Sequence, residues 1–109
     1  MRGVSFEVNG REFTLAFSTN AMVAYEKSRG EGVISAFQKM EGDAPSMLLI
    51  HGLFWSALTP KMTEDEAGDL IDEIGLSRAA HLLAEAARKA FEVSENPTEP
   101  TTKTRSKAG

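Results

Sequence analysis

The feature that most constrains the fold is an Asn9-Gly10 dipeptide between two short runs of alternating apolar residues. Both residues accept the positive φ angles of a two-residue type I′ turn, so the dipeptide predicts a tight β-hairpin. With this turn at the tip, Phe6 lies opposite Phe13, and the apolar residues of both strands share one face. A shift of one residue would turn one strand's apolar set to water. We therefore expect a hairpin over residues 4–17 that packs on the rest of the chain, because a hairpin alone is only marginally stable.

Beyond the hairpin, helical periodicity and capping residues predict a body of about four to five short helices. The third is apolar on nearly all sides, so we expect it in the centre of the core or partly covered by another chain. The expected helices span residues 19–29, 32–40, 45–58, 64–74 and 77–93, with a loop at 59–62. The expected boundary residues are Ser18 or Thr19, Gly30 with Gly32, Pro45 in a first turn, Thr63 with Glu66 as a capping box, Gly75 and Ser77.

The composition changes at Ser94, and this change sets the domain boundary. Residues 94–109 are almost entirely polar, so burial cannot offset the entropy lost on ordering, and we expect a disordered tail. A chain of 109 residues is otherwise one domain by size. The prediction is a single folded domain at 1–93 of the α+β class, mainly α, with an N-terminal β-hairpin packed on a helical bundle.

Several sequence features predict a soluble, cytoplasmic protein without a cofactor. Residues 1–5 lack the apolar core of a signal peptide, and the longest apolar run, 47–58, is too short to cross a bilayer. The absence of cysteine excludes disulfides and thiolate metal sites, and it suits a reducing compartment. We expect no membrane partner and no cofactor.

The charge distribution argues against a nucleic-acid partner. The net charge is −4, and six of the sixteen acidic residues fall between positions 64 and 73. Arg88, Lys89 and three basic residues of the tail are too few and too dispersed to form a DNA-binding face. The acidic run follows a capping box and therefore does not resemble a calcium loop. It reads as a solvated helix face or as a contact surface for a basic partner.

We find no catalytic motif in the chain. His51 and His81 are thirty residues apart on separate predicted helices, without a metal-binding spacing. His51 lies in the most apolar helix, so it could equally be a core histidine bonded to a backbone carbonyl. The serines form no Gly-x-Ser-x-Gly turn, and Gly30-Glu31-Gly32 lacks the rest of a phosphate-binding loop. We therefore expect a protein that is not an enzyme.

The order of these features resembles a known family. The segments that carry the resemblance are, in chain order, VSFEVNGREFTLAF, STNAMVAYEKSRGEGV, LLIHGLFWSAL and PKMTEDEAGDLIDEIGL, followed by an alanine-rich helix. Together they resemble the small tail assembly chaperones of tailed bacteriophages, prophages and gene transfer agents. The resemblance covers about residues 4–92. It depends on order and spacing, since the individual motifs are common.

The resemblance implies a non-catalytic role in the cytoplasm of a bacterial host. Such chaperones bind the tape-measure protein during tail morphogenesis, and they can also bring the tail-tube subunit to it. The alternative is a structural subunit, a minor tail or head–tail connector protein that stays in the particle. A homo-oligomer formed through the apolar third helix also remains open.

A partner surface can be predicted from residue chemistry. Methionine and tryptophan side chains fill cores, but they also line adaptable or energetically dominant parts of interfaces. Acidic residues nearby would form a polar rim. The candidate partner-binding residues are Met22, Met47, Phe54, Trp55, Glu64, Asp65, Asp69 and Asp72.

Overall fold

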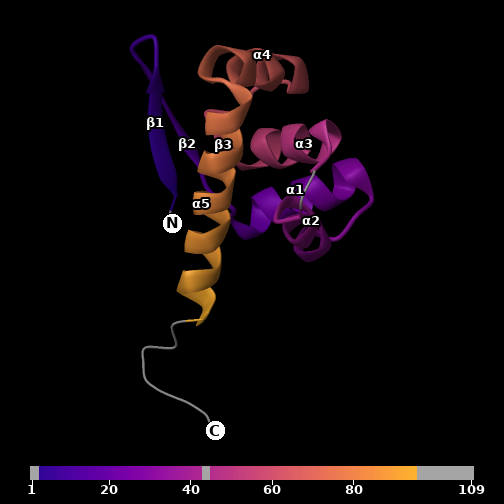
Figure 1. Ribbon diagram of the computed structural model, residues 1–109. Coiled ribbons are helices and arrows are strands. Elements are labelled where there is room, and N and C mark those ends of the chain that lie inside the picture. Colours follow the sequence, from indigo (N-terminus) through magenta and orange to yellow (C-terminus); the bar gives the residue numbers. More distant parts are fainter. Residues whose placement is uncertain (1–2, 43–44, 96–109) are drawn as a thin grey trace, which may run out of the picture.

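The computed structural model describes residues 3–42 and 45–95, and only the backbone of 92–95. Strands β1 (Val4–Val8) and β2 (Arg11–Leu15) precede helices α1 (Thr19–Arg29), α2 (Val33–Met40) and α3 (Met47–Ala57). A short strand β3 (Leu58–Thr59) leads to helices α4 (Glu64–Ile74) and α5 (Leu76–Glu95). Helix α5 packs against both hairpin strands and against α3 and α4 (Figure 1). The predicted class, α+β and mainly α with an N-terminal hairpin, is confirmed.

The hairpin has the predicted turn and register. Asn9 and Gly10 take φ angles of 52° and 80°, as a type I′ turn requires. Phe6 pairs with Phe13, and their stacked rings have centroids 5.7 Å apart. The ring of Phe6 also lies 6.2 Å from that of Phe54 in α3, so the apolar face of the hairpin packs on the helical body.

Three boundary predictions are wrong. Leu58 and Thr59, predicted as helix and loop, pair with β2 as a third strand, in the order β1-β2-β3. Pro45 precedes the N-cap Ser46 and so lies outside α3. Ser77 does not cap the last helix, because α5 begins at Leu76 and the Gly75 carbonyl accepts from the Ala79 amide. Helix α5 ends at Glu95, close to its expected end at about Val93, and residues 96–109 of the predicted tail lie outside the described residues.

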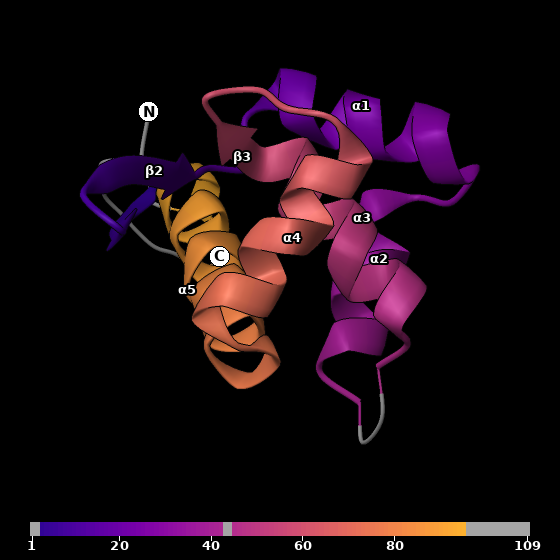
Figure 2. The same ribbon diagram turned by 90° about the horizontal axis from the view of Figure 1, so that it is seen from above.

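Helix α3 lies at the centre of the core, one of the two positions expected for it. It contacts α1, α2, α4, α5 and β2, and Leu53 and Phe54 are fully buried. Seen from above, α4 lies over the seam between α3 and α5 (Figure 2). In the first turn of α3, Met47 and Leu48 are exposed whereas Leu49 and Ile50 are buried, so one side of this turn faces solvent.

Side chains at the helix ends fix the helices relative to one another. Ser18 caps α1, and the predicted Thr63–Glu66 capping box begins α4. Helix α2 has no cap from its own N-cap residue, Gly32. Instead, Glu26 of α1 accepts a hydrogen bond from the Val33 amide at 2.9 Å. The carboxylate of Glu26 therefore satisfies one of the free amides at the start of α2.

Candidate functional site

A shallow groove of about 660 Å³ runs between the first half of α3 and the exposed side of α4. We call it the α3–α4 groove. One wall consists of Met47, Leu48 and His51 from α3. The opposite wall and the floor come from α4, and their residues are Glu64, Asp65, Gly68, Asp69, Ile71 and Asp72. Five of the eight predicted partner-binding residues thus lie together: Met47, Glu64, Asp65, Asp69 and Asp72.

The α3 wall is apolar and open to solvent. Met47 and Leu48 are 53% and 64% exposed, which makes them the two most exposed large hydrophobic residues of the described chain. They follow the N-cap Ser46, whose hydroxyl accepts from the Leu49 amide at 3.1 Å, so the turn that presents them is well formed. These two adjacent exposed apolar side chains beside a groove make this wall a candidate contact surface.

The α4 wall is acidic, and of its carboxylates only Glu64 has an ion-pair partner, Arg29, among the described residues. Asp65, Asp69 and Asp72 occupy positions i, i+4 and i+7, which places all three along one edge of the helix. Each is exposed, and no lysine or arginine of the described ranges lies within ion-pair distance of them. Asp65 belongs to the first turn, where the helix dipole favours a negative charge, but Asp69 and Asp72 lie beyond it.

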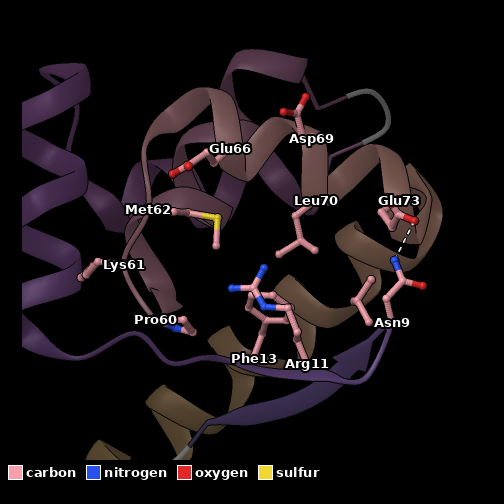
Figure 3. Close-up of a pocket in the computed structure, with 11 residues that line it drawn as sticks. Asn9, Arg11, Phe13, Pro60, Lys61, Met62, Glu66, Asp69, Leu70 and Glu73 are labelled. Carbon is pink, nitrogen blue, oxygen red and sulfur yellow. Dashed lines mark hydrogen bonds between the residues drawn. The ribbon is translucent and has the colours of Figure 1, made fainter.

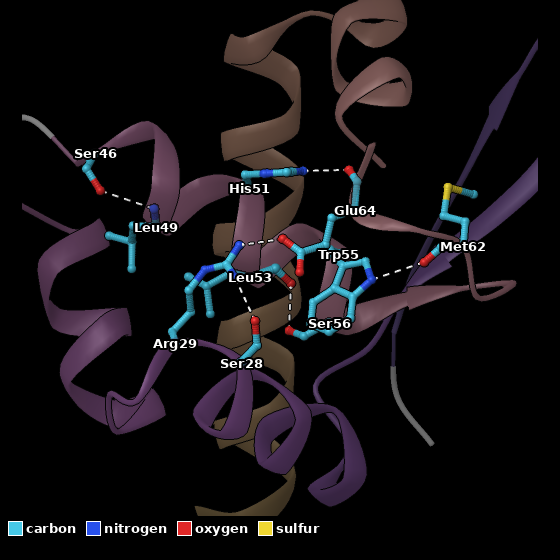
Figure 4. A network of polar contacts seen from close by, with 10 residues as sticks. All are labelled: Ser28, Arg29, Ser46, Leu49, His51, Leu53, Trp55, Ser56, Met62 and Glu64. Atoms are coloured by element: carbon cyan, nitrogen blue, oxygen red, sulfur yellow. Dashed lines mark hydrogen bonds and ion pairs between the residues drawn. The ribbon is translucent and has the colours of Figure 1, made fainter. Parts of the chain in front are cut away.

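Beneath the groove, a polar network connects three helices (Figure 4). The Nε2 of His51 donates to the backbone carbonyl oxygen of Glu64 at 2.6 Å. The Oε1 of Glu64 accepts from Nη2 of Arg29 at 3.0 Å, and the Arg29 side chain is only 13% exposed. His51 is therefore bonded to a backbone carbonyl, which is the alternative that the sequence offered to a catalytic or metal-binding role. The network holds α1, α3 and α4 in one arrangement.

Three predicted site residues lie outside the α3–α4 groove. Phe54 is fully buried, so a partner could reach it only by opening the core. Trp55 is half-buried, and its Nε1 donates to the Met62 carbonyl at 3.0 Å. Met22 is also half-buried and packs against the core. The methionine and tryptophan side chains thus divide between core filling and surface.

No protein-family model, curated protein or solved structure matches the chain. Within residues 3–42 and 45–95, we find no cluster of three or more histidines and acids that could hold a metal ion. None of the helices in that same part of the chain combines the length and apolar character needed to cross a bilayer.

A second cavity, of about 460 Å³, separates the hairpin tip from the other side of α4 (Figure 3). Its lining mixes charges, with Arg11 and Lys61 near Glu66, Asp69 and Glu73. At one end, Nδ2 of Asn9 donates to Oε2 of Glu73 at 3.0 Å, a contact that no sequence signal predicted. The two grooves beside α4 therefore differ: the charges near the hairpin are mixed in sign, whereas those of the α3–α4 groove are all negative.

Proposed function

We propose that the protein is a tail assembly chaperone, which binds the tape-measure protein during tail morphogenesis and carries out no chemistry of its own. The single observation that carries the proposal is the α3–α4 groove, where Met47 and Leu48 are exposed beside unpaired carboxylates. Such a surface suits recognition of another protein. The choice of partner comes from the resemblance of residues 4–92 to that family.

The physical demands of the role fit the groove. A tape-measure protein presents long amphipathic helices whose apolar faces would aggregate if left uncovered. Met47 offers a flexible thioether that adapts to varied apolar surfaces. A small surface used by many copies along one long partner gives coverage through repetition, and each contact stays weak enough to release during assembly.

Co-expression tests the proposal. The tagged chain is produced with the tape-measure protein of the same genome, and the product is analysed by size exclusion. We expect a complex that keeps the tape-measure protein soluble. We expect Met47→Ala/Leu48→Ala to weaken it, whereas Val23→Ala/Ile34→Ala, which removes two exposed apolar side chains elsewhere, leaves it intact.

One result of this co-expression experiment would contradict the proposal. If the tape-measure protein aggregates while this chain elutes alone, the chaperone role fails. Purified particles then discriminate the alternative, because a chaperone is absent from them and a minor tail or connector subunit is retained.

A further inference from the structure

We propose that the α3–α4 groove binds a basic amphipathic helix, with apolar side chains of that helix on Met47 and Leu48 and its lysines or arginines along Asp65, Asp69 and Asp72. The inference rests on the proposed function, because it describes the chemistry of that partner. The geometry of the groove does not depend on which protein the partner is. It predicts a sequence pattern in the partner rather than only an interaction.

The groove favours a helix over an extended peptide. Its walls are two α-helices whose backbone groups are hydrogen-bonded internally, so an extended strand would find no row of backbone donors and acceptors. A third helix needs none, because it packs its side-chain ridges into the groove between α3 and α4. Recognition then depends on apolar anchors at helical spacing.

Charge selects a basic occupant. Asp65 and Asp69 are four residues apart and Asp69 and Asp72 are three apart, so adjacent carboxylates on α4 repel one another. A partner helix with positive charges at i, i+4 and i+7 would span the same ~10 Å of helix axis and relieve this repulsion. A second copy of this chain suits the groove less well, because it carries a net charge of −4.

Gly68 on the groove floor supports the inference independently of the charges. A glycine inside a helix is unfavourable relative to alanine, so its presence needs a reason. At Gly52 in α3 the reason is internal, since an added Cβ would lie 2.8 Å from Nε of Arg29. At Gly68 the closest atom to an added Cβ would be Nε2 of His51, at an ordinary 3.5 Å. Packing within the chain does not require this glycine, but close approach of a partner helix would.

A peptide-binding experiment tests the inference. The full chain is titrated into a labelled synthetic helix with a leucine stripe flanked by lysines, and binding is followed by fluorescence anisotropy. The control peptide has the lysines replaced by glutamates. We expect saturable binding of the basic peptide that weakens as salt is raised, and at least about tenfold weaker binding of the acidic one.

Matched variants locate the binding. Asp65→Asn/Asp69→Asn/Asp72→Asn should weaken binding about tenfold, whereas Glu7→Gln/Glu12→Gln/Glu41→Gln removes the same charge elsewhere and should not. Gly68→Leu should block the floor while keeping the helix, and Gln38→Leu adds an exposed leucine on α2 as its control. Thermal melts of all variants establish that each is folded.

The outcomes separate the two proposals. Equal binding of both peptides, or loss in the charge control as large as in the groove variant, overturns the groove assignment. Self-association abolished by Met47→Ala/Leu48→Ala, without peptide binding, identifies a second copy as the occupant and also overturns it. If the tape-measure protein binds but the groove variants bind it unchanged, the chaperone role stands and this inference fails. If the basic peptide binds the groove but the tape-measure protein does not bind the chain, this inference stands and the chaperone role fails.

Discussion

Replacing Gly52 by alanine is the sharpest test of how α1 packs on α3. Gly52 is buried in the middle of α3, and the side chains of Arg29 and Tyr25 lie directly over it. An added Cβ would lie 2.8 Å from Nε of Arg29 and 3.0 Å from Cε1 of Tyr25. Neither neighbour can easily move away, because Glu64 holds the Arg29 guanidinium and Glu31 accepts from the Tyr25 hydroxyl.

The magnitude follows from two opposing effects. Alanine in a helix interior is about 1 kcal/mol more favourable than glycine. Overpacking of a tight core contact costs about 1–3 kcal/mol, and displacement of the partly buried Arg29 from Glu64 adds about 1 kcal/mol more. We expect Gly52→Ala to lower the free energy of unfolding by about 1–3 kcal/mol.

Gly68→Ala is the matched control. It makes the same exchange inside α4, but the new methyl group meets only His51, at an ordinary contact distance. The helix-propensity gain should therefore survive, and the free energy of unfolding should rise by about 0.5–1 kcal/mol. Urea unfolding of the two variants beside the parent measures both effects, and the midpoints should separate by about 1–3 M. Equal stabilisation by both substitutions would refute the packing of Arg29 and Tyr25 over Gly52.

The remaining predictions concern a helix cap and two buried aromatic side chains. Glu26→Ala should lower the free energy of unfolding by about 1 kcal/mol, since the Val33 amide loses its cap. Glu26→Gln keeps an acceptor oxygen and should retain most of this stability in the same urea unfolding experiment. Burial, assisted by the hydrogen bond to Glu31, raises the pKa of Tyr25, the single tyrosine, to about 12. The unfolded chain loses this proton first, so the tyrosine contribution to stability should be constant below pH 10 and fall between pH 10 and 12; ultraviolet titration and alkaline melts of Tyr25→Phe check this. Phe54→Ala should cost about 3–5 kcal/mol, visible as a large fall in melting temperature, and a loss under 1 kcal/mol would contradict its place in the core.

The sequence predicted those parts of the fold that depend on local chemistry. The Asn9-Gly10 turn, its register and the Thr63–Glu66 capping box each depend on residues within a few positions of one another, and all three are confirmed. Strand β3 was missed because two residues carry no periodicity. Leu58 and Thr59 become a strand only through pairing with β2, more than forty residues earlier in the chain.

Gly75 shows why the start of α5 was misplaced. Ser77 has good capping chemistry, but Gly75 ends α4, and its carbonyl accepts the first hydrogen bond of α5. One residue thus serves both helices, which leaves no room for a separate cap. The Glu26 cap on α2 was missed for a related reason, since it comes from a different helix.

The site was predicted only in part because α3 is apolar on nearly all sides. An amphipathic pattern identifies an exposed face, but α3 has none, and Phe54 could not be distinguished from Met47 by periodicity. The structure separates them by position along the helix. Met47 is the first residue of the helix and is exposed, whereas Phe54 lies seven residues later, where the hairpin and the other helices surround α3.

Features that cost stability in the isolated chain converge on one place. Leu48 leaves apolar surface in water, Asp69 lies between two like charges of its own helix, and Gly68 weakens that helix without a packing need. Gly52, by contrast, has an internal reason, since the side chains of Arg29 and Tyr25 lie over it. Departures from local consistency concentrate at functional sites because selection retains them for something other than folding. A ligand that covers the apolar pair, neutralises the carboxylates and uses the space above Gly68 would offset all three costs at once, and a basic amphipathic helix has that chemistry.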